Sequence, residues 1–178
     1  MFEVKDLKVI AQGNQVLLHD VSFSLKPGQC LGLTGASGSG KTTLLKAIMG
    51  VLPPGCRLDS GTLLLDRVEL QNLSASKRRN YCGTVLGFIP QNPMTAFDPA
   101  SKIGVQLYET FRLRMGMDAA AAQQMAVQLL RDVNLEDTAR ILNAYPQQLS
   151  GGMLQRVAMA LLAGLAPRSS YLGECCCG

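Results

Sequence analysis

The segment from Gly35 to Thr42 reads Gly-Ala-Ser-Gly-Ser-Gly-Lys-Thr and matches the phosphate-binding pattern G-x-x-x-x-G-K-[ST] at every fixed position. Glycines let successive backbone N–H groups turn inward around a triphosphate, where a Cβ would obstruct the approach. We expect Lys41 to reach the β- and γ-phosphates and the Thr42 hydroxyl to ligate Mg²⁺. A glycine-rich turn that binds nothing is the alternative. The residues predicted to hold the nucleotide here are Gly35, Ser37, Gly38, Ser39, Gly40, Lys41, Thr42 and Thr43.

A second pair of glycines, preceded by a serine, stands before an apolar helical pattern near the end of the chain. This segment, Ser150 to Gly152, would form a helix N-terminus that attracts an anion. The Ser150 hydroxyl could cap the helix or donate a hydrogen bond to the anion. One chain has little use for two such termini on one phosphate, whereas two facing chains could enclose each nucleotide between them. A plain serine-capped helix is the alternative.

The elements that must position these motifs follow from hydrophobic periodicity. Apolar residues alternate over residues 2–10 and 16–25, as in half-buried strands. Short apolar runs predict further strands over residues 30–34, 62–66 and 85–89. The predicted helices span residues 41–50, 103–115, 119–133, 136–143 and 153–165. In this order the strands come first and the helices follow as an inserted block.

Composition places the chain among globular proteins, because 47% of its residues are hydrophobic and its net charge is only +4. The basic stretch 77–80 motivates a nucleic-acid-associated ATPase as a remote alternative, but so short a stretch is usually a solvated turn, and we expect no nucleic acid partner. Half of the six cysteines fall in the last four residues. Three adjacent cysteines do not readily converge on one ion, so no metal site is expected there. The first three, Cys30, Cys56 and Cys82, are expected to be free thiols, with free buried thiols as the plainest interpretation.

Together the motifs resemble the nucleotide-binding subunit of ABC transporters. Residues 35–42 are similar to its P-loop, residues 149–156 to its signature motif, and Gln91 to its Q-loop glutamine. The resemblance implies that Gln91 contacts Mg²⁺ and the attacking water, and couples the site to a membrane partner. It also implies that four signature residues bind the nucleotide of a facing subunit: Ser150, Gly151, Gly152 and Gln155.

Residues 92–99, 103–106 and 109–110 are similar to the branch that imports dipeptides, oligopeptides and nickel. Residues 51–55 lean toward nickel import subunits. The resemblance implies a peripheral ATP-binding subunit at the cytoplasmic face of the inner membrane, with ATP and Mg²⁺ as cofactors. The implied partners are membrane permease subunits, a second ATP-binding subunit in a homo- or heterodimer, and indirectly a substrate-binding protein. Lys41 and Gln91 are the implied catalytic residues.

The implied architecture is an α/β fold, a P-loop NTPase of the ABC type. It has an N-terminal antiparallel β region, a mainly parallel core sheet and an inserted helical subdomain over about residues 93–150. Family members follow the signature helix with an apolar strand that ends in Asp-Glu, the Walker B pair. Here Gly173 and Glu174 fall at those two positions, and residues 169–172 are not an apolar run. We therefore expect a nucleotide-binding domain over residues 1–168 with an incomplete core, and an aberrant tail over 169–178. A hydrolysis-defective nucleotide-binding fragment is the alternative to an active ATPase.

The family usually places an aromatic residue after the first strand, where it stacks on adenine, and residues 10–14 contain none. The grip on the triphosphate should then dominate affinity. We predict that the chain binds ATP and GTP with comparable dissociation constants, measured by titration of each Mg-nucleotide under identical conditions. A strong preference for adenine would contradict this prediction.

Overall fold

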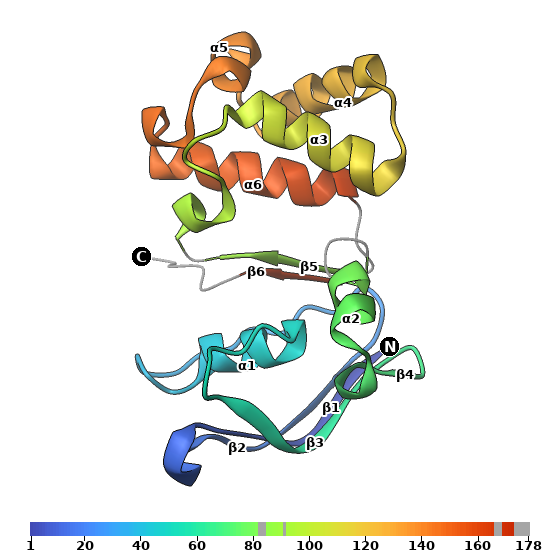
Figure 1. The fold of residues 1–178 in the computed structure, drawn as a ribbon, viewed down its shortest axis with the longest axis vertical. Coiled ribbons are helices and arrows are strands. Elements are labelled where there is room, and N and C mark those ends of the chain that lie inside the picture. Colours follow the sequence, from blue (N-terminus) through green and yellow to red (C-terminus); the bar gives the residue numbers. More distant parts are fainter. Residues whose placement is uncertain (82–84, 91, 166–168, 173–178) are drawn as a thin grey trace. The chain divides into compact units, whose positions relative to one another are not determined.

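The computed structural model describes residues 1–81, 85–90, 92–165 and 169–172. It divides the chain into two compact units, Met1–Asn80 and Tyr81–Gly178 (Figure 1). The first unit contains an antiparallel sheet and the helix that follows the glycine-rich loop, and the second contains most of the helices. Within the described residues, no helix is both long and apolar enough to cross a membrane.

An antiparallel sheet of four strands organises the first unit (Figure 1). Its strands lie in the order β2-β1-β3-β4. Their bounds are β1 Phe2–Ile10, β2 Val16–Leu25, β3 Arg57–Leu65 and β4 Val68–Glu69. The central strand β1 pairs with β2 and β3, and its apolar side chains are buried on one face. The expected antiparallel β region at the N-terminus is therefore confirmed.

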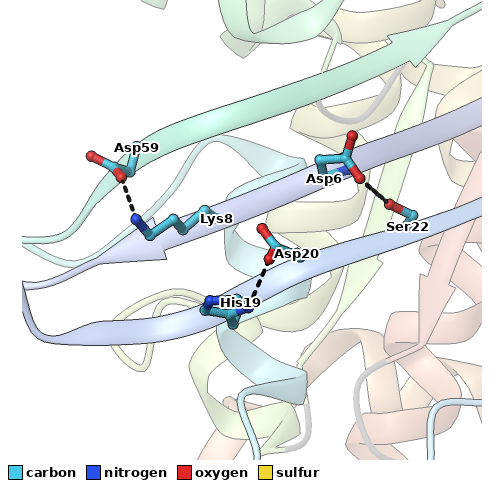
Figure 2. Close-up of polar contacts among 6 residues, drawn as sticks. All are labelled: Asp6, Lys8, His19, Asp20, Ser22 and Asp59. Atoms are coloured by element: carbon cyan, nitrogen blue, oxygen red, sulfur yellow. Dashed lines mark hydrogen bonds and ion pairs between the residues drawn. The ribbon is translucent and has the colours of Figure 1, made fainter.

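A bulge at Asp6 keeps the apolar residues of β1 on the buried face. Two exposed residues, Lys5 and Asp6, separate the buried Val4 and Leu7, and the pairing with β2 shifts at this point. Asp6 has a φ of 47°. Its backbone N–H donates to the Ser22 hydroxyl at 2.8 Å, and this hydroxyl donates back to Asp6 Oδ1 at 3.0 Å (Figure 2). The bulge thus corrects a strict alternation that would have turned Leu7 toward solvent.

The first unit also contains two helices and two 3-10 turns. They are η1 (Gln12–Asn14), α1 (Lys41–Met49), η2 (Leu70–Asn72) and α2 (Ala75–Tyr81), whose last residue belongs to the second unit. The helix predicted over 41–50 is confirmed as α1. The basic stretch expected to be a solvated turn lies in α2 instead, because the hydroxyl of Ser74 accepts from the backbone of Lys77 and helps to start a helix there.

Residues 30–34 do not form the predicted strand. They belong to neither described sheet and are exposed, and the thiol of Cys30, expected to be buried, is exposed with them. An apolar run becomes a strand only where neighbouring strands supply backbone partners. Cys56 is half-buried, and the thiols of Cys30 and Cys56 are free, as expected. Cys82 lies outside the described residues.

Helices dominate the second unit and enclose its core. They are η3 (Pro93–Ala96), α3 (Ile103–Met115), α4 (Ala119–Asp132), α5 (Thr138–Asn143), η4 (Pro146–Gln148) and α6 (Gly151–Leu165). The side chains of Asp118 and Asp137 cap α4 and α5. Phe111 of α3 is fully buried in the core. Gly164 of α6 lets α3 and α4 approach, because a Cβ there would lie 2.5 Å from Leu129 Cδ1 and 2.9 Å from Phe111 Cε1.

A short parallel sheet joins two segments that are distant in the sequence. Strand β5 (Leu86–Ile89) pairs in parallel with β6 (Ser169–Leu172) (Figure 1). Parallel pairing matches the expected P-loop core. The residues of β6 fall within the tail that we expected to be aberrant, yet they form a strand, because the backbone groups of β5 offer hydrogen-bond partners whatever the side chains. Residues 173–178 lie outside the described part of the chain.

The bulge at Asp6 yields a stability prediction. A Cβ at Gly61 of β3 would lie 2.5 Å from the Asp6 carbonyl oxygen and 2.6 Å from Leu7 Cα, at a φ of +95°. Gly28 is a matched control, since it has a φ of +79° and nothing within 4 Å of a Cβ. We expect Gly28→Ala to cost about 1–2 kcal/mol for its positive φ. Gly61→Ala should cost about 1–3 kcal/mol more, because overpacking adds to that strain. Urea denaturation measures both variants, and equal losses would contradict the role of Gly61.

Candidate nucleotide-binding site

The glycine-rich loop ends where α1 begins, and its backbone is built from positive φ values. Gly35, Gly38 and Gly40 have φ values of +153°, +82° and +92°. The Ser39 N–H donates to the Ala36 carbonyl at 3.2 Å and closes a turn within the loop. Gly40 is the N-cap of α1 and brings no side chain to the helix start. The first backbone N–H groups of a helix have no intrahelical acceptor, so this end of α1 suits an anion.

Gly35 and Gly40 have close neighbours, whereas the space beside Gly38 is free. A Cβ at Gly40 would lie 2.5 Å from Leu18 Cδ2 and 3.0 Å from the Leu17 carbonyl oxygen, so β2 directly abuts the start of α1. A Cβ at Gly35 would lie 2.9 Å from Ser39 Oγ. A Cβ at Gly38 would meet nothing within 4 Å. The loop therefore packs against β2 at Gly40, whereas its backbone is uncovered at Gly38, where a ligand can approach it.

Lys41 lies against the loop that precedes it. Its Nζ donates to the carbonyl oxygens of Gly35 at 2.9 Å and Ala36 at 3.0 Å, and lies 3.5 Å from Ser39 Oγ. The ammonium is thus held beside the bare backbone of the loop. It adds a full positive charge to the partial charge of the helix end.

The hydroxyl-bearing residues of the loop are accessible. Ser37, Ser39 and Thr42 are exposed, and Thr43 is half-buried. The residues fit a phosphate: an open glycine backbone at Gly38, an ammonium and a helix start. The exposed Thr42 hydroxyl is the oxygen donor that a hard cation beside such a phosphate requires. The described residues contain no group of three or more His, Cys, Asp or Glu side chains placed to hold a metal.

The second motif starts α6 as expected. The Ser150 hydroxyl accepts from the Met153 N–H at 3.3 Å, so the serine caps the helix. Gly151, Gly152 and Gln155 are exposed. A Cβ at either glycine would meet nothing within 4 Å, so packing within the chain does not require glycine at these positions. The start of α6 is therefore a bare surface that a molecule from outside can approach closely.

Contacts that the sequence did not indicate hold this helix start in place. The Arg156 guanidinium donates from Nη1 to the Asn134 carbonyl at 3.0 Å. It thereby ties α6 to the turn after α4, where Asn134 has a φ of 57°. Upstream, the Tyr145 N–H donates to Gln148 Oε1 at 2.8 Å and shapes η4. The contact between Arg156 and Asn134 joins residues that are 22 positions apart, so it leaves no local pattern in the sequence.

The predicted site residues fall into two groups. The loop residues 35–43 belong to the first unit and residues 150–155 to the second. Gln91 lies outside the described residues, as do Gly173 and Glu174. His19 is exposed on β2, with its Nδ1 2.8 Å from Asp20 Oδ2 (Figure 2).

The fold and the loop geometry are those of the P-loop NTPase fold, which belongs to the α/β class. Comparison with known protein families narrows the class further, because the family described as "ABC transporter" matches residues 18–174 of this chain. The chain therefore belongs to the ABC transporter family. Its fold is also that of a solved cassette: the ATP-binding cassette MJ0796, in a dimeric post-hydrolysis state bound to ADP and Pi, superposes with a TM-score of 0.83 at 24% identity. That match covers 97% of this chain and 73% of the cassette.

Curated relatives are ATP-binding proteins of transport and import systems. The nickel import ATP-binding protein NikD of Pseudomonas putida is 40% identical over 165 residues, which cover 92% of this chain and 61% of that protein. The dipeptide transport ATP-binding protein DppD of Escherichia coli is 37% identical over 148 residues, which cover 83% of this chain and 45% of that protein. The chain thus spans about half the length of the curated relatives it matches. The resemblance to the branch that imports dipeptides and nickel is confirmed.

The cap on α6 yields a second stability prediction. Ser150→Ala removes the acceptor for the Met153 N–H, and we expect it to lower the free energy of unfolding by about 1 kcal/mol. Ser150→Asn keeps a capping acceptor and should lose much less. Thermal and urea unfolding of the two variants provide the comparison, and an unchanged Ser150→Ala variant would contradict the capping role.

Proposed function

We propose that this chain is the nucleotide-binding part of an ABC importer for nickel or for di- and oligopeptides, and that it binds ATP with Mg²⁺. The glycine-rich loop carries the proposal. Its bare backbone at Gly38, the Lys41 ammonium and the start of α1 converge on one place within the first unit. Family membership and the identity to NikD and DppD support the transport role.

In this proposal each loop residue has a defined task. The backbone N–H groups of Gly38, Gly40 and Lys41 surround the phosphates, and Gly35, Ser37 and Ser39 shape the loop around them. The Lys41 ammonium exchanges its contacts with the loop carbonyls for the β- and γ-phosphates. The Thr42 hydroxyl would hold Mg²⁺, and the ion would supply positive charge beside the phosphoryl group.

The signature residues act on a second subunit. The bare surface at Gly151 and Gly152, with Ser150 and Gln155 beside it, approaches the γ-phosphate bound by the facing chain. ATP then closes a homo- or heterodimer, and hydrolysis reopens it. The dimeric state of the cassette MJ0796 supports this arrangement.

The wider assembly follows from the import role. Permease subunits would receive the motion of the dimer, a substrate-binding protein would deliver the cargo, and the chain would be peripheral at the cytoplasmic face of the inner membrane. Gln91 would contact Mg²⁺ and the attacking water and couple the site to the permease. We also propose the domain limits expected above, a nucleotide-binding domain over residues 1–168 with its helical subdomain over about 93–150.

A second candidate is a nucleotide-binding chain that does not hydrolyse ATP. It is favoured by the absence of an Asp-Glu pair after the signature helix, since Gly173 stands at the first position. An acidic residue that supports Mg²⁺ and another that polarises water are central to phosphoryl transfer. The two candidates differ in turnover and agree on binding.

Lys41→Ala tests both candidates. Removing a charged hydrogen-bond donor costs about 1.5–3 kcal/mol, which corresponds to roughly a 10- to 100-fold loss of Mg-ATP affinity. Lys46→Ala is the control, because Lys46 lies in the last turn of the same helix. Isothermal titration with Mg-ATP measures binding, and phosphate release measures turnover.

Unchanged affinity of Lys41→Ala, or no Mg-ATP binding by the parent chain, would overturn the proposed site. Phosphate release by the parent chain that disappears in Lys41→Ala would support the active ATPase. Binding without release would support the second candidate.

A further inference from the structure

A guanidinium group caps the carboxyl end of α1, the end away from the glycine-rich loop. Arg78 of α2 donates from Nη2 to the carbonyl oxygens of Ala47 at 2.8 Å and Ile48 at 2.7 Å. Its Nη1 donates to the carbonyl oxygen of Leu70 in η2. One side chain thus joins the last turn of α1 to the segment that follows the antiparallel sheet.

The chemistry of a helix end explains why this contact is strong. The last four carbonyl groups of a helix lack intrahelical donors and carry partial negative charge. In α1 the Val51 N–H satisfies the Lys46 carbonyl at 2.9 Å, and the Gly50 N–H reaches the Ala47 carbonyl at 3.1 Å. Arg78 adds the bonds to Ala47 and Ile48. The planar fork of a guanidinium can serve several acceptors at once, whereas a lysine ammonium acts as a compact point charge.

Gly50 makes room for this group. It ends α1 with a φ of +72°, and a Cβ on it would overlap Arg78 Nε and lie 2.9 Å from Arg78 Cδ and Cζ. The positive φ favours glycine at this position, and the Arg78 side chain occupies the space that a Cβ would take. Three part-buried hydrogen bonds, to the carbonyl oxygens of Leu70, Ala47 and Ile48, hold the guanidinium there.

The loop depends on how α1 is held. The helix has nine residues, and isolated helices this short are marginal in water. Gly40 fixes its start against Leu17 and Leu18, while Arg78 fixes its end against Leu70. Because the nine residues of α1 move together, a shift of its carboxyl end also displaces its amino end, where Lys41 and the loop amides lie.

We propose that Arg78 is a positioning residue for triphosphate binding. It holds the carboxyl end of α1 and thereby fixes Lys41 and the loop amides at the amino end. This inference rests on the proposed binding of Mg-ATP at the glycine-rich loop. The competing explanation is that Arg78 only stabilises the fold. A purely stabilising residue changes the fraction of folded chain but not the affinity or the phosphate environment of the folded protein.

The test compares four variants of the full chain by titration with Mg-ATP, at a temperature well below every unfolding midpoint. We expect Arg78→Ala to weaken Mg-ATP binding by about tenfold, which corresponds to about 1.4 kcal/mol, and Arg78→Lys to recover part of the loss. Lys77→Ala is the control on α2. Ile141→Ala, buried in the second unit, is the control for lost stability. Both controls should bind like the parent chain.

Phosphorus NMR of the bound nucleotide provides a readout that stability does not move. The β-phosphate resonance should shift in Arg78→Ala and stay unchanged in Ile141→Ala. Parental affinity and resonance in a folded Arg78→Ala variant would overturn the inference and leave the proposed site intact, whereas a parent chain that binds no Mg-ATP would overturn both. If Arg78→Ala does not fold, Arg78→Lys decides alone: a weaker affinity with a shifted resonance supports the inference, and parental values overturn it.

Discussion

The anchoring of α1 at its two ends is the constraint on which the candidate site depends. At its start, Gly40 leaves no space between the helix and Leu17 and Leu18 of β2. At its end, Arg78 joins the carbonyl groups of Ala47 and Ile48 to that of Leu70. A nine-residue helix gains little from its own hydrogen bonds. Its position, and with it the position of the loop amides, is therefore set by the sheet and turns around it.

The antiparallel sheet has its own constraint, which is the bulge at Asp6. The extra residue restores the buried face of β1, and Gly61 on β3 leaves the space that the displaced backbone occupies. The Ser22 hydroxyl then satisfies the bulged backbone from the other neighbouring strand. One irregularity is thus shared by three strands, and it supports the same β2 that abuts α1.

Local patterns predicted most of the elements, because each element follows from the residues within it. The helical spacing after residue 101 corresponds to α3, α4, α5 and α6, and the alternation over residues 2–25 corresponds to β1 and β2. The segment 30–34 is a counterexample, since apolar character alone did not make a strand. The strand β6 is the converse, since it forms beside β5 without an apolar run. In both cases the outcome depends on backbone partners from another part of the chain.

The amino-acid sequence by itself determined the chemistry of this protein: a glycine-rich loop with Lys41 and Thr42, a serine-capped helix start at Ser150, and membership of the ABC transporter family. These features are readable because the pattern of residue types is itself the phosphate-binding device. Only the tertiary structure revealed that Gly40, Gly50 and Gly61 are each shaped by a distant neighbour, and that Arg78 of a basic stretch closes the end of α1. The physical reason is that hydrogen bonds and close packing between segments far apart in the chain depend on where the fold places them, which no local pattern encodes.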